Sequence, residues 1–128
     1  MNYASPVDVA RAFTLAYYSY NWKHPATLDP VVRVEPYATG GYLGTLQPLA
    51  QVFPQRMTAA QEVSAATIRS AAVPPDAPGT AGGSAFVEIQ YAQHLTDHGQ
   101  SAEDESAWSL DMVKVGGVWL VAAVVDQD

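Results

Sequence analysis

The C-terminal stretch Ala107–Val125, "AWSLDMVKVGGVWLVAAVV", predicts a β-hairpin. Two apolar runs flank Gly116-Gly117, and a glycine pair between such runs is a strong signal for a two-residue turn. The turn predicts the cross-strand pairs Val115–Val118, Lys114–Trp119, Met112–Val121, Leu110–Ala123 and Trp108–Val125. We therefore expect the chain to end in two long antiparallel strands.

Strand alternation gives this hairpin two different faces. One face is apolar except for Lys114 at its end, and we expect it to join the core. The opposite face carries Ser109 and Asp111 far from the turn, but it is apolar near the turn. An apolar sheet surface of this kind is normally covered by more chain or by a partner. The candidate interface residues are Val113, Val115, Val118 and Leu120.

Two further strands are predicted upstream of the hairpin. "SAFVEIQYAQHLT" (84–96) alternates apolar and polar residues, and "QEVSAATIRSAAV" (61–73) is a weaker strand of small residues. The connecting segments "PPDAPGTAGG" (74–83) and "DHGQSAEDES" (97–106) have little to bury, so we expect exposed loops. The acidic run Glu103–Glu105 is then a solvated part of the second loop.

The N-terminal part of the chain predicts helices. Ser5 is a good N-cap before Pro6, and the helix that they start should end near residues 21–23, ahead of His24-Pro25. His24 is then a cation at the C-terminus of this helix.

Two shorter helices, Pro30–Tyr37 and Gly40–Phe53, are expected to begin at the caps Asp29 and Thr39. Helices followed by a meander of about four strands predict a single α+β domain over residues 1–128.

The end of the first helix is rich in aromatic residues, "AYYSYNWKHP" (16–25). Helical spacing predicts that Phe13, Tyr17 and Tyr20 pack on the sheet, whereas Tyr18 and Trp22 meet the short helices. Our first interpretation is that these rings pack in the hydrophobic core. The alternative is a binding pocket, whose candidate residues are Tyr17, Tyr18, Trp22, Trp108 and Asp111.

Composition excludes several classes of function. A net charge of −7 with only six scattered Lys and Arg residues argues against direct nucleic-acid binding. The chain has no cysteine, which removes disulfides, zinc–thiolate sites and thiol nucleophiles. No run approaches the ~20 apolar residues of a membrane span, and the N-terminus lacks the features of a signal peptide. We therefore expect a soluble domain whose own residues do not cross a membrane, and any membrane attachment would come from a segment absent from this chain.

No catalytic motif is evident, so we assign no catalytic, cofactor-binding or metal-binding residue. In "HLTDH" (94–98), histidines four apart on a strand lie ~13 Å from each other, too far to share a metal. Asp111 lies beside apolar neighbours and is a candidate acid or base, with a tyrosine such as Tyr17 as a hydrogen-bond donor. The simpler interpretation is that Asp111 faces solvent.

Two stretches together resemble a known superfamily. "VARAFTLAYYSYNWKHP" (9–25) is followed by "DPVVRVEPYATGGYLGTL" (29–46), and the chain closes with the hairpin "AWSLDMVKVGGVWLVAAVV". This order is similar to the nuclear transport factor two-like superfamily. Within it, the pattern most resembles the soluble domains of type IV secretion and conjugation channel-assembly (VirB-eight-like) proteins and of Mce-associated membrane proteins. The resemblance implies a cone in which N-terminal helices pack into a strongly curved antiparallel sheet.

The resemblance also implies a location and a role. Such domains typically follow a single membrane helix and lie outside the cytoplasmic membrane. Our first hypothesis is therefore a non-catalytic, extracytoplasmic assembly domain of a conjugative DNA-transfer apparatus, acting through homo-oligomerisation and protein contacts. The alternative is a small-molecule enzyme or binding protein of the ketosteroid isomerase or SnoaL type that uses the cone interior. No catalytic residue of those enzymes matches a position in this chain, and fold alone does not decide function.

Overall fold

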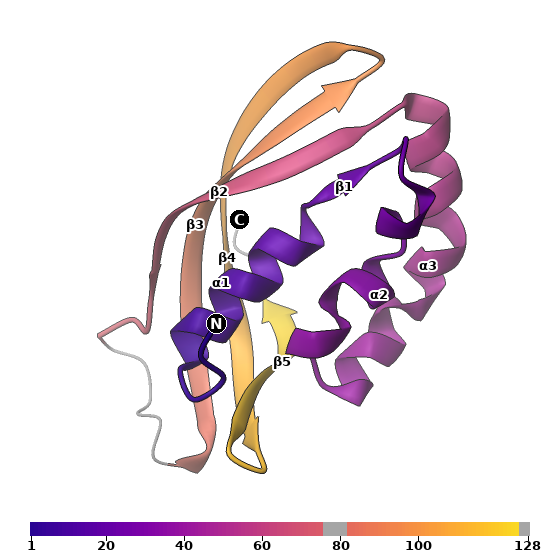
Figure 1. The fold of residues 1–128 in the computed structure, drawn as a ribbon. Coiled ribbons are helices and arrows are strands. Elements are labelled where there is room, and N and C mark those ends of the chain that lie inside the picture. Colours follow the sequence, from indigo (N-terminus) through magenta and orange to yellow (C-terminus); the bar gives the residue numbers. More distant parts are fainter. Residues whose placement is uncertain (76–81, 126–128) are drawn as a thin grey trace.

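A five-stranded antiparallel sheet curls around helix α1, while α2 and α3 stand beside it (Figure 1). The computed structural model describes residues 1–75 and 82–125. The elements are α1 (Pro6–Tyr17), β1 (Tyr20–Asn21), η1 (Pro25–Thr27), α2 (Pro30–Val34), η2 (Glu35–Tyr37), α3 (Gly40–Ala60), β2 (Val63–Ala72), β3 (Ser84–Asp97), β4 (Gln100–Val115) and β5 (Val118–Val125). The strands follow one another in the order β1-β2-β3-β4-β5. The predicted α+β class and curved antiparallel sheet are confirmed, with the two-residue strand β1 in addition to the strands that we expected.

The predicted N-caps of all three α-helices are confirmed. The Ser5 hydroxyl accepts a hydrogen bond from the Asp8 amide (3.2 Å), and the Asp29 carboxylate accepts one from Val31 (2.9 Å). The Thr39 hydroxyl accepts a hydrogen bond from the Tyr42 amide of α3 (3.1 Å). Each cap provides an acceptor for a backbone donor that the first helical turn leaves unpaired.

Helix α1 ends at Tyr17, so the predicted end near residues 21–23 is wrong. The guanidinium of Arg33 donates hydrogen bonds to the carbonyls of Ala16 (3.1 Å) and Tyr17 (2.9 Å). Carbonyls in the last turn have no partner within their own helix, and Arg33 supplies one. The chain beyond is extended, and Tyr20–Asn21 pairs with the start of β2.

His24 consequently lies far from the end of α1. It occupies the N-cap position of the 3₁₀ turn η1, and its carbonyl accepts a hydrogen bond from the Thr27 hydroxyl (2.8 Å). Its predicted role as a helix C-terminal cation is wrong, because the helix ends several residues earlier.

Helix α3 continues to Ala60, beyond the predicted end at Phe53. Pro54 lies inside this helix, although proline there removes a hydrogen bond and crowds the preceding turn. In the turn after Pro54, Met57 is 2% exposed and packs with Tyr20 and Leu28. Burial of Met57 therefore favours continuation of the helix past the proline.

Strands β3 and β4 form a longer hairpin than predicted. The expected loop at 97–106 is wrong, because pairing continues from Ser84–Val113 to Asp97–Gln100. The turn consists of His98 (φ 51°) and Gly99 (φ 80°), and positive φ at both central residues suits the twist of a two-residue hairpin. The acidic run lies on strand β4, exposed as expected. Of the predicted loop at 74–83, residues 76–81 lie outside the described residues.

The β4–β5 hairpin turns at Gly116-Gly117 as predicted. The pairs Val115–Val118, Lys114–Trp119 and Met112–Val121 are confirmed. Beyond them a bulge inserts Ala122, so Leu110 pairs with Val124 and Ser109 pairs with Val125. The predicted pairs Leu110–Ala123 and Trp108–Val125 are wrong by one residue, as expected when one strand carries an extra residue.

The core lies between α1 and the concave face of the sheet. Val9 and Phe13 of α1 are fully buried there, against inward-facing residues of the last three strands. These include Val87, Ile89, Trp108, Leu110, Met112, Trp119 and Val121. None of the helices in the described part of the chain has the length and hydrophobicity to cross a membrane.

Candidate functional site

Aromatic rings fill the concave face where α1 ends. The Trp108 ring lies 5.9 Å from that of Phe13, 5.4 Å from that of Tyr17 and 5.3 Å from that of Tyr18, measured between centroids. Tyr91 of β3 completes the cluster at 4.9 Å from Tyr18. Tilted and edge-on contacts at these distances are favourable for aromatic pairs. The expected packing of Phe13 and Tyr17 against Trp108 is confirmed.

Two hydrogen bonds join polar groups in and beside this cluster. The hydroxyls of Tyr18 and Tyr91 are 2.6 Å apart, and the Trp108 indole donates to the Thr14 hydroxyl at 3.0 Å. Burial, followed by the hydrogen bond to Tyr91, raises the pKa of Tyr18 far above its usual value of 10.0. Tyr18 therefore stays neutral, and its hydroxyl is already engaged within the core.

The early end of α1 changes the positions of two aromatic side chains. Tyr18 packs on the sheet, although we expected it among the short helices. Tyr20 was expected on the sheet and is instead buried with Leu28 and Met57. Its hydroxyl donates to Glu62 (3.0 Å), and burial together with this bond raises the pKa of Tyr20 to about 12.

A cavity of about 350 Å³ opens beside the aromatic cluster, between the helices and the ends of β2 and β3. Its lining residues are Tyr17, Tyr18, Tyr20, Arg33, Phe53, Arg56, Met57, Glu62, Gln93 and Leu95. The charged groups in it are largely occupied. Arg33 donates to three backbone carbonyls, those of Ala16, Tyr17 and Thr27, and burial lowers the pKa of its guanidinium.

The residues of the predicted pocket lie in three places. Tyr17, Tyr18 and Trp108 are together in the aromatic cluster. Trp22 lines a separate depression beside Gln61 and Gly99. Asp111 lies on the other face of the sheet, as strand alternation from the inward-facing Leu110 and Met112 requires. The structure thus brings three of the five candidates together and separates the carboxylate from the rings.

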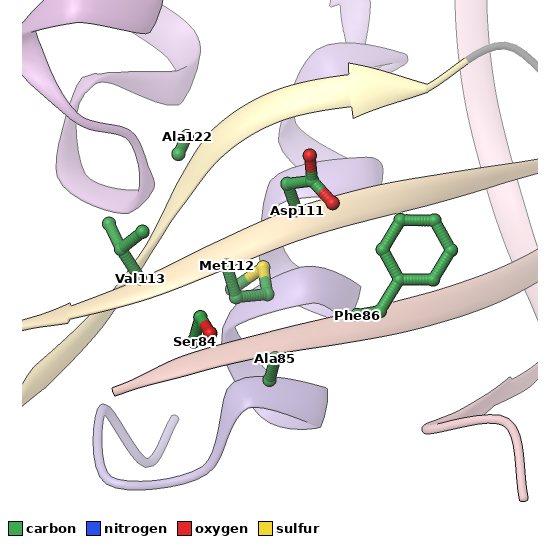
Figure 2. Close-up of a pocket in the computed structure, with 7 residues that line it drawn as sticks. All are labelled: Ser84, Ala85, Phe86, Asp111, Met112, Val113 and Ala122. Atoms are coloured by element: carbon green, nitrogen blue, oxygen red, sulfur yellow. The ribbon is translucent and has the colours of Figure 1, made fainter. Parts of the chain in front are cut away.

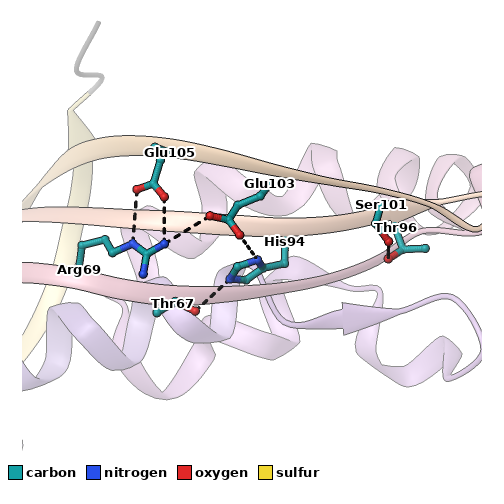
Figure 3. A network of polar contacts seen from close by, with 7 residues as sticks. All are labelled: Thr67, Arg69, His94, Thr96, Ser101, Glu103 and Glu105. Carbon is teal, nitrogen blue, oxygen red and sulfur yellow. Dashed lines mark hydrogen bonds and ion pairs between the residues drawn. The ribbon is translucent and has the colours of Figure 1, made fainter.

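A network of polar side chains crosses strands β2, β3 and β4 (Figure 3). Arg69 contacts Glu105 (3.0 Å) and Glu103 (3.4 Å), and Glu103 in turn contacts His94 (3.1 Å). The His94 ring is also within 3.0 Å of the Thr67 hydroxyl. The hydrogen bond from Arg69 lowers the pKa of Glu105. All these groups are exposed, and no cluster of three metal-ligating side chains occurs within residues 1–75 and 82–125.

The candidate interface residues line the outer face of the β4–β5 hairpin, near its turn. Val113 pairs with Leu120 and Val115 pairs with Val118, which makes two adjacent apolar rungs. We call these four residues the hairpin patch. Val115 is 56% exposed, and the other three are partly buried.

A hollow of about 340 Å³ adjoins the hairpin patch on the same face (Figure 2). Phe86 of β3 lies directly opposite Asp111 of β4. Val113 belongs to the hairpin patch and also lines the hollow. The remaining lining residues are Ser84, Ala85, Met112 and Ala122. Ala85 and Met112 face the core and border the hollow from below, whereas the small side chains of Ser84 and Ala122 add little bulk to it.

Sequence reasoning missed several residues that shape these cavities. The alternation in "SAFVEIQ" already places Phe86 on the face opposite Val87, so a signal existed. Nothing local indicates that Ala122 is the extra residue of a bulge. Nor does any spacing connect Arg33 to the carbonyl of Tyr17, because the contact depends on how α2 packs beside α1.

Comparison with known proteins establishes the fold. No protein-family model and no curated protein sequence matches the chain. Among solved structures, the periplasmic domain of DotI has a TM-score of 0.72 at 13% identity, covering 98% of this chain and 94% of that one. An IcmL-like type IV secretion system protein from Legionella pneumophila has a TM-score of 0.71 at 12% identity, with coverages of 98% and 91%. CagV, a VirB8 homolog of the type IV secretion system of Helicobacter pylori, has a TM-score of 0.63 at 9% identity, with coverages of 96% and 98%.

Proteins described as NTF2-like are also among the similar structures. The chain has the NTF2-like fold. The curved sheet around α1 is the shape that the sequence resemblance implied, and this expectation is confirmed. At identities of 9% to 16%, these likenesses establish the NTF2-like fold only, because one fold serves many functions.

Proposed function

We propose that this chain is an extracytoplasmic assembly domain of a conjugative DNA-transfer or type IV secretion apparatus. It acts by docking other proteins, including copies of itself, on the hairpin patch. The observation that carries this proposal is the partly exposed apolar surface at Val113, Val115, Val118 and Leu120. The other face of the same strands is buried in the core. The likeness to periplasmic domains of secretion systems supports the proposed location and class of partner.

The composition of the patch suits protein contacts. Cores of protein interfaces are depleted in charged residues and enriched in apolar ones. The patch contains four aliphatic residues on two paired strands, so they form a continuous and rigid surface. Burying it against a partner removes apolar area from water without desolvating a charge.

A charge-introducing variant with a matched control tests this proposal. Val115→Asp places a carboxylate in the hairpin patch, and Val32→Asp places one on α2 at nearly equal exposure, 58% against 56%. We expect sedimentation velocity to show concentration-dependent self-association of the wild type and of Val32→Asp, and its loss in Val115→Asp. Equal association of all three proteins, with unchanged circular dichroism, would remove the hairpin patch as the docking surface.

A second candidate function is binding of a small apolar ring compound in the cone. The cavity of about 350 Å³ beside the aromatic cluster favours it, because its volume lies in the range of ligand pockets and its wall is aromatic. A thermal-shift screen with steroids and polyketides distinguishes the two functions. Stabilisation that Phe53→Ala abolishes would support the pocket, and no stabilisation by any such compound would exclude it.

A further inference from the structure

We propose that the hollow beside the hairpin patch accepts an arginine side chain of a partner protein. The inference rests on the proposed function, because the hollow and the hairpin patch share Val113 and would face the same partner. It adds to that function the chemistry by which the partner is recognised.

The first observation is a carboxylate without a counter-ion. Among the described residues, none pairs with the Asp111 side chain through a hydrogen bond or an ion pair. The cross-strand neighbours of Asp111 are Phe86 and Ala123, which offer no donor from their side chains. Arg69, on β2 beyond the intervening strand β3, is already paired with Glu103 and Glu105. A basic group from elsewhere is therefore the natural partner for Asp111.

The second observation is the ring that faces this carboxylate across the hollow. Phe86 and Asp111 are directly opposed on adjacent strands, and such pairs place their Cβ atoms about 5 Å apart. Figure 2 shows the Phe86 ring and the Asp111 carboxylate bordering the same space. A guanidinium between them would lie flat on the ring and donate to the carboxylate at once. An ammonium can also contact a ring, but it lacks the flat donor fork that suits this arrangement.

The third observation is a second unpaired polar atom nearby. Ser109 is two residues before Asp111 on β4, and strand alternation gives both residues the same face. Its hydroxyl is buried, at 1% residue exposure, and has no hydrogen-bond partner among residues 1–75 and 82–125. Buried hydroxyls are normally paired, so the described residues leave one polar group on this face of the sheet unsatisfied.

Charge complementarity favours a different protein over a second copy as the source of the arginine. The chain carries 13 acidic and only six basic residues. Of its four arginines, Arg33 is held by three carbonyls, Arg69 by two carboxylates, and Arg56 lies 4.5 Å from the centre of the Phe53 ring. Among the described residues this leaves the exposed Arg11 as the arginine that a second copy would offer. A partner with a basic side chain among apolar residues complements both the hollow and the hairpin patch.

Titration with a minimal probe tests the proposal on the whole chain. N-acetyl-arginine methylamide is added to ¹⁵N-labelled protein, and N-acetyl-citrulline methylamide serves as the neutral isostere. We expect the arginine probe to shift the amide signals of Phe86, Asp111 and Ala122, with a dissociation constant on the order of 10 mM for so small a ligand. The citrulline probe should shift them far less.

Variants of the hollow provide the controls. Asp111→Asn should weaken binding of the arginine probe at least about threefold, the modest loss expected for a partly exposed ion pair. Phe86→Leu should also weaken it, whereas Asp104→Asn, an exposed carboxylate elsewhere on β4, should not. Equal binding by wild type and Asp111→Asn, or larger shifts at residues 103–105 than at the hollow, would overturn the proposal. That result would leave the docking function standing, because Val115→Asp tests it without the arginine probe.

Discussion

Arg33 is the residue whose removal tests the packing of the helices most sharply. Its guanidinium donates to the carbonyls of Ala16 (3.1 Å), Tyr17 (2.9 Å) and Thr27 (2.7 Å), and it lies 5.1 Å from the centre of the Tyr20 ring. It thereby joins α2 to the end of α1 and to the turn before α2. Arg33→Met keeps much of the aliphatic stem and removes every one of these donors.

The expected cost follows from the bonds lost. Each hydrogen bond contributes about 1 kcal/mol after exchange with water, so three bonds to a charged donor amount to about 3 kcal/mol. For a domain of this size, that loss lowers the melting temperature by roughly 12 °C. Arg33→Lys should recover only part of it, because one ammonium cannot reach three carbonyls with the geometry of a guanidinium.

Urea denaturation followed by tryptophan fluorescence measures this effect. Arg11→Met is the matched control, since Arg11 is an exposed arginine of α1, and we expect it to change the free energy of unfolding by less than about 0.5 kcal/mol. A loss below about 1 kcal/mol in Arg33→Met would refute the role assigned to Arg33. So would full recovery in Arg33→Lys, because charge alone would then explain the effect.

Further predictions concern the tyrosines and the β3–β4 turn. Tyr18→Phe removes the hydrogen bond to Tyr91 and should lower the free energy of unfolding by about 1 kcal/mol in the same denaturation assay; no change would contradict the pairing. The pKa of Tyr20 rises from 10.0 to about 12 on folding, so the stability of the wild type should be intact below pH 10 and fall between pH 10 and 12. The stability of Tyr20→Phe should fall less steeply over the same range. Urea midpoints measured across this range test the difference. Gly99→Ala places a side chain at φ 80° and should cost about 1 kcal/mol. Gly44→Ala, in open space within α3, should instead stabilise the protein in a thermal melt by up to about 1 kcal/mol.

Local chemistry explains which parts of the fold were predictable. The caps Ser5, Asp29 and Thr39 act within three residues of themselves, and Gly116-Gly117 determines the turn between its own neighbours. Alternation along β4 was sufficient to divide the core face from the hairpin patch. These signals need no knowledge of the rest of the chain.

The errors share a different origin, because each depends on distant residues. The end of α1 is decided by Arg33, 16 residues beyond the carbonyl of Tyr17. The polar strands around the turn at His98 look like loops in the sequence, yet they pair fully with each other. The candidate pocket is a separate case, because strand alternation alone places Trp108 and Asp111, three residues apart on β4, on opposite faces.

The central claim is that the hairpin patch serves assembly of a transfer apparatus, and conjugation itself tests it most directly. The source strain carries the full-length gene with Val115→Asp or with Val32→Asp, and the frequency of DNA transfer is measured at equal protein abundance. We predict that Val115→Asp lowers the transfer frequency at least about tenfold, because one charge in an apolar contact costs more than about 1.4 kcal/mol. Val32→Asp should leave the transfer frequency unchanged. Normal transfer after deletion of the whole domain would contradict the account.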